Sequence, residues 1–140
     1  MKAKKKDNPP HPAQYEAKVL DEMIMVEPGA WRAYPVPIDL DKMPGCHIKG
    51  AFNVAGGYGS DIEVIIFYER CYRQWEHRMV RNYRGNPREV PSLYRSGRVA
   101  MANFDIELPR SDTYYFVFNN HFSNFSYKEV TARVFLSYGE

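Results

Sequence analysis

The sequence predicts an all-β fold: an antiparallel β-sandwich of two sheets, with seven or eight strands and at most one short helix. Short apolar or alternating runs recur between turn signals, as in sandwiches and barrels. Aromatic residues make up 15% of the chain, which suits pleated sheets. Strands do not alternate with long helical segments, so a parallel sheet is not expected. Two antiparallel sheets packed face to face bury such strands efficiently.

The chain of 140 residues is long enough for one domain with a real core. Residues 1–18 combine lysine, proline and polar side chains with almost nothing apolar, so a flexible basic tail is expected. An anchor for an anionic surface is the alternative for this tail. Residues 19–140 are then a single β-sandwich domain.

No apolar stretch follows the basic N-terminus, so no signal peptide is indicated, and a cytoplasmic location is expected unless a leader is missing. No run approaches the roughly 18 apolar residues of a membrane helix, so no integral membrane segment is expected.

The first three strands are expected at residues 19–26, 31–40 and 46–55. Pro35 and Pro37 remove ladder donors, which favours an edge or bulged position for the second strand. Its apolar pattern changes register near Pro35. In the third strand, Gly50 suggests a bulge.

Residues 61–69, DIEVIIFYE, form the strongest strand, because apolar residues on both faces indicate a central position. Phe67, Cys71, Trp75 and Met79 then recur every four residues, which indicates a helical turn near 71–79. A long excursion covers residues 80–96. Later strands are expected at 97–108, 113–120 and 129–138. The core should unite central and C-terminal strands through Ile62, Val64, Ile66, Phe116, Phe118, Val134 and Leu136.

The glycine-rich GGYGSD segment, residues 56–61, differs from a phosphate-binding loop. It has no Gly-Lys-Ser/Thr ending, and a strand follows it instead of a helix. We interpret it as a tight loop between strands, in which Asp61 bonds turn amides.

No catalytic or metal-binding motif is present. The four histidines form no HxH, HxxxH or HExxH pattern, and no GxSxG elbow occurs. No metal, no cofactor and no enzymatic activity are therefore expected. Cys46 and Cys71 leave a disulfide and two free thiols both open.

Residues 69–98 hold eight arginines against three glutamates, a net charge of +5, and all eight arginines lie in the segment 70–98. Its candidate ligand-binding residues are Arg81, Arg84, Arg88 and Tyr83, since guanidinium groups and stacking aromatics bind nucleic acids and other anions such as acidic lipids. The favoured alternative is a solvated basic surface outside the core. Sheet aromatics also leave a carbohydrate-binding module open, although core packing is the expected role of Trp31 and Trp75.

The C-terminal segment YYFVFNNHFSNFSYKEVTARVFL resembles the last strands of GOLD-type (emp24-like) domains. In those domains an aromatic Y-x-F-x-F-x-N strand precedes a Phe/Ser turn, followed by Lys and Val. The matching residues here are Tyr114, Phe116, Phe118, Asn120, Phe122, Ser123, Lys128 and Val130. Secretory members carry a cysteine where Val117 stands, so a stand-alone member is the closer match.

This resemblance implies a jelly-roll-like sandwich and a non-enzymatic binding module that contacts another protein. It also implies that Asn120 and Ser123 belong to a structural turn rather than to a catalytic site. Asn suits such a turn because it tolerates left-handed backbone and can bond nearby amides.

Overall fold

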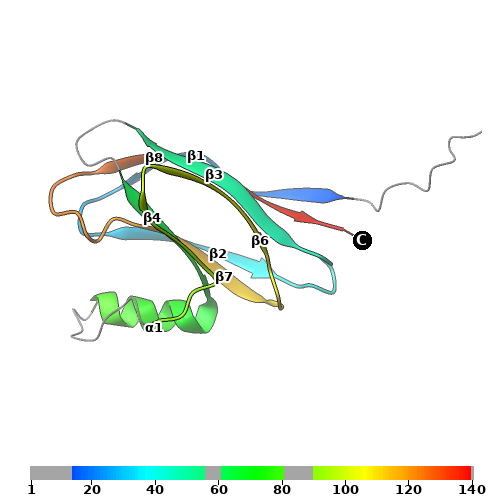
Figure 1. Ribbon diagram of the computed structural model, residues 1–140. Coiled ribbons are helices and arrows are strands. Elements are labelled where there is room, and N and C mark those ends of the chain that lie inside the picture. The colour runs from blue at the N-terminus through cyan, green and yellow to red at the C-terminus, as the bar shows by residue number, and fades with distance from the viewer. Residues whose placement is uncertain (1–13, 56–60, 81–89, 140) are drawn as a thin grey trace, which may run out of the picture.

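The computed structural model describes residues 14–55, 61–80 and 90–139, and within them it shows a β-sandwich of two four-stranded antiparallel sheets (Figure 1). The all-β prediction is confirmed. The elements are β1 (Tyr15–Val26), β2 (Trp31–Ile38), β3 (His47–Ala55), β4 (Ile62–Tyr68), α1 (Glu69–Val80), β5 (Tyr94–Val99), β6 (Met101–Glu107), β7 (Asp112–Asn119) and β8 (Lys128–Tyr138).

The strand orders are β1-β8-β3-β6 in one sheet and β2-β7-β4-β5 in the other. This is the eight-stranded jelly-roll arrangement of two Greek keys. The expected single strand at residues 97–108 is wrong in one respect, because the chain forms two strands there. β5 and β6 belong to different sheets and are separated only by Ala100, where the chain crosses over.

The main core lies between the two sheets. It contains the whole set expected from the sequence: Ile62, Val64, Ile66, Phe116, Phe118, Val134 and Leu136. In β8 the inward side chains are Val130, Ala132, Val134 and Leu136, and the alternation of buried and exposed residues is regular as far as Leu136.

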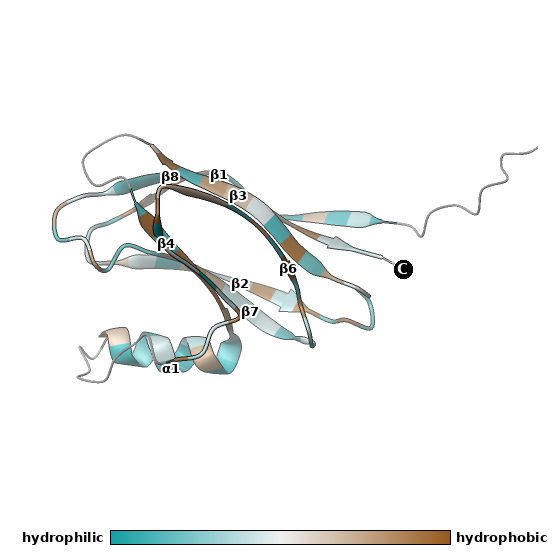
Figure 2. Ribbon diagram, in the orientation of Figure 1, coloured by the Kyte–Doolittle hydropathy of each residue, from teal (hydrophilic) through white to brown (hydrophobic). Residues whose placement is uncertain are grey.

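A second, smaller core lies on the outer face of the β2-β7-β4-β5 sheet, beneath α1. Ile65 and Phe67 of β4 and Val117 of β7 pack there against Tyr72 and Trp75 of the helix. Glu69 in the first turn of α1 and basic residues in the last turn complement the helix dipole. Two buried faces explain why β4 is apolar on both sides, which Figure 2 shows as hydrophobic colour along this strand.

Trp75 is buried, as expected, whereas Trp31 is half-buried at the margin of the second core, with its ring centroid 5.1 Å from that of Trp75. The predicted edge position of β2 is confirmed. The expected change of the apolar pattern near Pro35 is present, although β2 pairs with β7 without a shift. Trp31 and Ala33 face the second core, while Val36 and Ile38 face the main core, so the apolar pattern changes face and the backbone does not slip.

Two other boundaries differ from the expectation. β1 begins at Tyr15, so residues 15–18 belong to a strand and not to a tail. Gly50 carries no bulge, since β3 pairs continuously with both neighbours. A Cβ at Gly50 would lie 2.4 Å from the main-chain oxygen of Arg133, so glycine is required by close packing of β3 on β8.

Candidate functional site

Residues 120–127, which join β7 to β8, form a corner at one end of the sandwich (Figure 1), and side-chain hydrogen bonds of Asn120 anchor it. The Asn120 side chain is fully buried. Its Nδ2 donates to the main-chain oxygens of Val26 at 3.2 Å, Glu27 at 3.1 Å and Ser126 at 2.9 Å. These three acceptors fix the orientation of the amide, because a flipped amide would place its oxygen against them.

The main chain reinforces this anchor. The Asn120 N–H donates to the Ala30 oxygen at 2.9 Å, and the Gly29 N–H donates to the Asn120 oxygen at 3.2 Å. Gly29 has a φ of +73°, which favours glycine at this turn. The β1–β2 turn and the corner therefore form one structural unit.

Ser123 closes the corner on itself. Its Oγ accepts a hydrogen bond from the Ser126 N–H at 3.1 Å and donates to the Ser126 oxygen at 3.2 Å. Phe125 lies between these two residues and is 90% exposed. The corner thus holds a large aromatic side chain in solvent on a hydrogen-bonded backbone.

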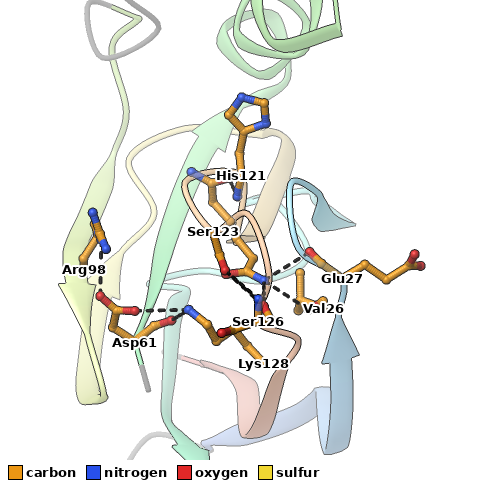
Figure 3. A network of polar contacts seen from close by, with 10 residues as sticks. Val26, Glu27, Asp61, Arg98, His121, Ser123, Ser126 and Lys128 are labelled. Atoms are coloured by element: carbon orange, nitrogen blue, oxygen red, sulfur yellow. Dashed lines mark hydrogen bonds and ion pairs between the residues drawn. The ribbon is translucent and has the colours of Figure 1, made fainter. Parts of the chain in front are cut away.

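Asp61, immediately before β4, binds two cations from other strands (Figure 3). The Lys128 side chain is only 4% exposed, and its Nζ donates to the Asp61 main-chain oxygen at 2.7 Å and to Oδ1 at 3.1 Å. Arg98 Nε donates to Oδ2 at 3.2 Å. The Phe122 ring lies near both cations, 4.0 Å from Arg98 Cζ and 4.9 Å from Lys128 Nζ. This contact joins β4 and β5 of one sheet to β8 of the other.

The sequence predicted turn amides as the partners of Asp61. The turn itself, residues 56–60, lies outside the described residues, and the partners that are seen are Lys128 and Arg98. In the sequence, only the family resemblance singled out Lys128, as one of its matching residues. A lysine between Tyr127 and Glu129 gives no sequence signal of burial.

The four candidate ligand-binding residues, Arg81, Tyr83, Arg84 and Arg88, also lie outside the described residues. Several arginines of the described part face acids: Arg73 lies 3.6 Å from Glu69 and 3.5 Å from Glu76, and Arg95 lies 3.7 Å from Glu63. Their charge is therefore partly neutralised within the domain.

The expectation that the whole segment 70–98 lies outside the core is wrong. Tyr72, Trp75 and Val90 are buried in the second core, and β5 is part of a sheet. Burial is the leading cause that raises the pKa of Tyr72. Tyr72 and Trp75 of α1 thus serve packing, and the Arg73 guanidinium lies over the rings of Tyr72 and Tyr115 at the margin of this core.

The two cysteines are free thiols, which settles the open alternative. Cys46 is fully buried in the main core, and burial raises the pKa of its thiol, so this group is chemically inert in the folded state.

Four large apolar side chains are exposed around the corner and the adjoining end of β1: Met23 at 60%, Met25 at 40%, Phe125 at 90% and Tyr127 at 60%. Met23 pairs with Thr131 and Met25 with Glu129 on the outer face of the β1-β8-β3-β6 sheet. Tyr127 directly precedes β8, two residues before Glu129. We call these four residues the corner patch.

Within the described residues, no three His, Cys, Asp or Glu side chains are grouped as a metal site would require. The described helix is too short and too polar to cross a membrane.

The chain was also compared with known proteins. No family model matches it, and no curated protein matches it. The resemblance to GOLD-type domains therefore rests on the C-terminal motif alone, and the fold is established by the strand order of the two sheets.

Proposed function

We propose that this domain is a non-enzymatic protein-binding module and that the corner patch is its contact surface. The observation that carries the proposal is the exposure of Met23, Met25, Phe125 and Tyr127 at one end of the sandwich. Soluble domains rarely expose several large apolar side chains together unless they bind something there. Methionine and aromatic residues are also enriched in protein interfaces.

The hydrogen bonds of the corner support this role. Asn120 and Ser123 hold the backbone on both sides of Phe125, so little main-chain freedom remains to be lost on binding. A pre-ordered contact residue binds more tightly than a flexible one, because its conformational entropy is lost on folding and not on binding. The family resemblance, which implies protein contacts, agrees with this reading.

The charges beside the patch indicate the chemistry of the partner. Glu27 and Glu129 are exposed beside it, whereas Lys128, which directly follows Tyr127, is buried against Asp61. An acidic border favours a partner whose apolar socket is lined at its rim by lysine or arginine. A hydrophobic centre with a charged rim is the usual anatomy of a protein interface.

The test places a photo-crosslinking amino acid at Phe125 in the full chain, expressed in its native cell. Met101 is the matched control position, since it is 68% exposed on the opposite edge of the same sheet. We expect one protein to be captured from position 125 and not from position 101. The captured protein, purified, should bind the parent chain and lose at least about tenfold in affinity for Phe125→Ser, as expected for an aromatic hot spot.

Two results would count against the proposal. Equal capture from both positions would show only non-specific contact. Unchanged affinity of the purified partner for Phe125→Ser and Tyr127→Ser would place its contact elsewhere. The thermal midpoint of each variant serves as the folding control, and it should not change because both side chains face solvent.

A further inference from the structure

One cross-strand row of the β1-β8-β3-β6 sheet combines a bulge with a closely packed glycine. Leu20, Val134, Gly50 and Phe104 are paired with one another across the four strands. β1 has a bulge between Lys18 and Leu20, next to this row, and Gly50 lets β3 approach β8 closely within it. Bulges and glycines are the usual means of curving a sheet.

A depression of about 660 Å³ lies along this row. Most of the side chains that line it belong to the two flanking rows, which face outward: Lys18, Phe135 and Lys49 on one side, and Asp21, Arg133 and Ala51 on the other. Gly50 has no side chain and Ala51 has only a methyl group, so the surface over β3 is recessed in this region. The volume is within the range of small-molecule sites.

Phe135 stands in the middle of the depression. It belongs to neither hydrophobic core, and within the described residues no other ring or cation stacks on it. Lys18 and Lys49 are its cross-strand neighbours on either side. The site therefore offers an aromatic side chain as a platform, flanked by hydrogen-bond donors.

Charges of both signs line the depression without neutralising one another. Among the described residues, Lys18 and Arg133 form no ion pair, and neither do Glu16 and Asp21. Lys49 has only a long contact, 3.9 Å, to Asp105. A simple anion would meet the two carboxylates, and a simple cation would meet the lysines and the arginine.

We propose that this depression binds a neutral saccharide. A sugar hydroxyl donates to a carboxylate and accepts from an ammonium or guanidinium group, so one polyhydroxyl ligand satisfies both kinds of side chain. The apolar face of a sugar ring can lie on Phe135. The proposal is independent of the corner patch, because Phe135 and Arg133 lie in rows beyond those of Met23 and Met25.

The test is a titration of the ¹⁵N-labelled full chain with cellohexaose, xylohexaose, mannohexaose and chitohexaose, followed by NMR. We expect at least one of them to shift the amide resonances of Lys49, Gly50, Ala51, Arg133 and Phe135. The affinity should change less than about twofold between roughly 50 and 500 mM NaCl, because the ligand is uncharged. Phe135→Ala should weaken binding at least about tenfold, Phe135→Tyr should retain it, and Met101→Ala should match the parent.

Lys18→Gln, on the edge strand, tests the site without changing its aromatic platform, and it should also weaken binding. Three outcomes would overturn the proposal: no shift at these residues with any of the four saccharides, equal binding by the parent and Phe135→Ala, or shifts at the same residues caused by sodium phosphate and abolished by salt. The last outcome would identify an anion site.

Discussion

At the scale of single residues, the corner depends on the difference between an amide and a carboxylate. Asn120 Nδ2 serves three carbonyl oxygens, and its Oδ1 has no hydrogen-bond partner among the described residues. The sequence identified this asparagine as part of a turn and expected it to bond nearby amides. It could not show that the partners are carbonyls, because two of them, from the last residue of β1 and the turn after it, are more than 90 positions away.

Asn120→Asp keeps the shape of the side chain but places a carboxylate against three acceptors. We expect a loss of at least about 3 kcal/mol in the free energy of unfolding, because a buried charge is left without a donor. Urea denaturation measures this loss. Asn124→Asp, an exposed change in the same corner, should cost little, and an equal loss in both variants would contradict the role given to Asn120.

The pair of Asp61 and Lys128 gives a second prediction at this scale. Asp61→Asn leaves the buried Lys128 ammonium without its counter-charge, and we expect a loss of about 2–3 kcal/mol, less than for a fully buried pair because Asp61 is partly exposed. Adding Lys128→Met should recover part of the loss. A double-mutant cycle in urea measures the coupling, and additive losses would show that the two charges do not interact.

At the scale of elements, the apolar pattern predicted a strand or helix well where each of its faces keeps the same surroundings along the whole element. β4 and β8 were predicted from their apolar patterns, as was α1 from its four-residue spacing, although the helix is longer than expected. The division between β5 and β6 was missed, because the chain changes sheet at Ala100 without a proline or glycine. In β2 the first half packs against the second core and the second half against the main core. The apolar residues therefore change face along the strand, although its pairing with β7 has no shift.

Phe118 of β7 tests the main core. It is fully buried among aromatic rings, with the Phe116 centroid at 5.1 Å, so Phe118→Ala should cost about 3–5 kcal/mol. The measurement is the shift of the urea midpoint at constant slope. A cost below about 1 kcal/mol would mean that the side chain does not pack as the structure shows.

Gly50→Ala tests the close approach of β3 to β8. Where the backbone fits, this substitution usually stabilises a protein by about 0.4–1 kcal/mol. Here the new methyl group would meet the Arg133 oxygen, and we expect destabilisation by about 1–3 kcal/mol. The measurement is the thermal midpoint, which should decrease. An increase would show that β3 and β8 move apart easily to accommodate the methyl group.

At the scale of the whole molecule, the two cores should differ in stability. The main core is enclosed by both sheets, whereas the second is covered on one side by α1. Each core carries one free cysteine, Cys46 in the main core and Cys71 in α1. Helices that pack on a sheet from outside can open locally while the sheets stay intact.

We therefore expect a thiol reagent to modify Cys71 at urea concentrations where Cys46 is still protected. Cys46 should react only at global unfolding, because burial raises the pKa of its thiol and denies access to it. Labelling followed by mass spectrometry of the peptides separates the two sites. Simultaneous modification would mean that helix and sandwich unfold as one cooperative unit.

Strands β1 and β8 are paired along their length, with Tyr15 opposite Tyr138 and their rings stacked at 5.6 Å. The same pairing runs to Val26 opposite Lys128 at the other end, beside the corner. The start of β1 and the end of β8 are thus at one pole, and the corner between β7 and β8 is at the opposite pole (Figure 1). A host protein, surface or bead attached at that pole would leave the corner at the far end of the domain, exposed to solvent and free to contact a partner.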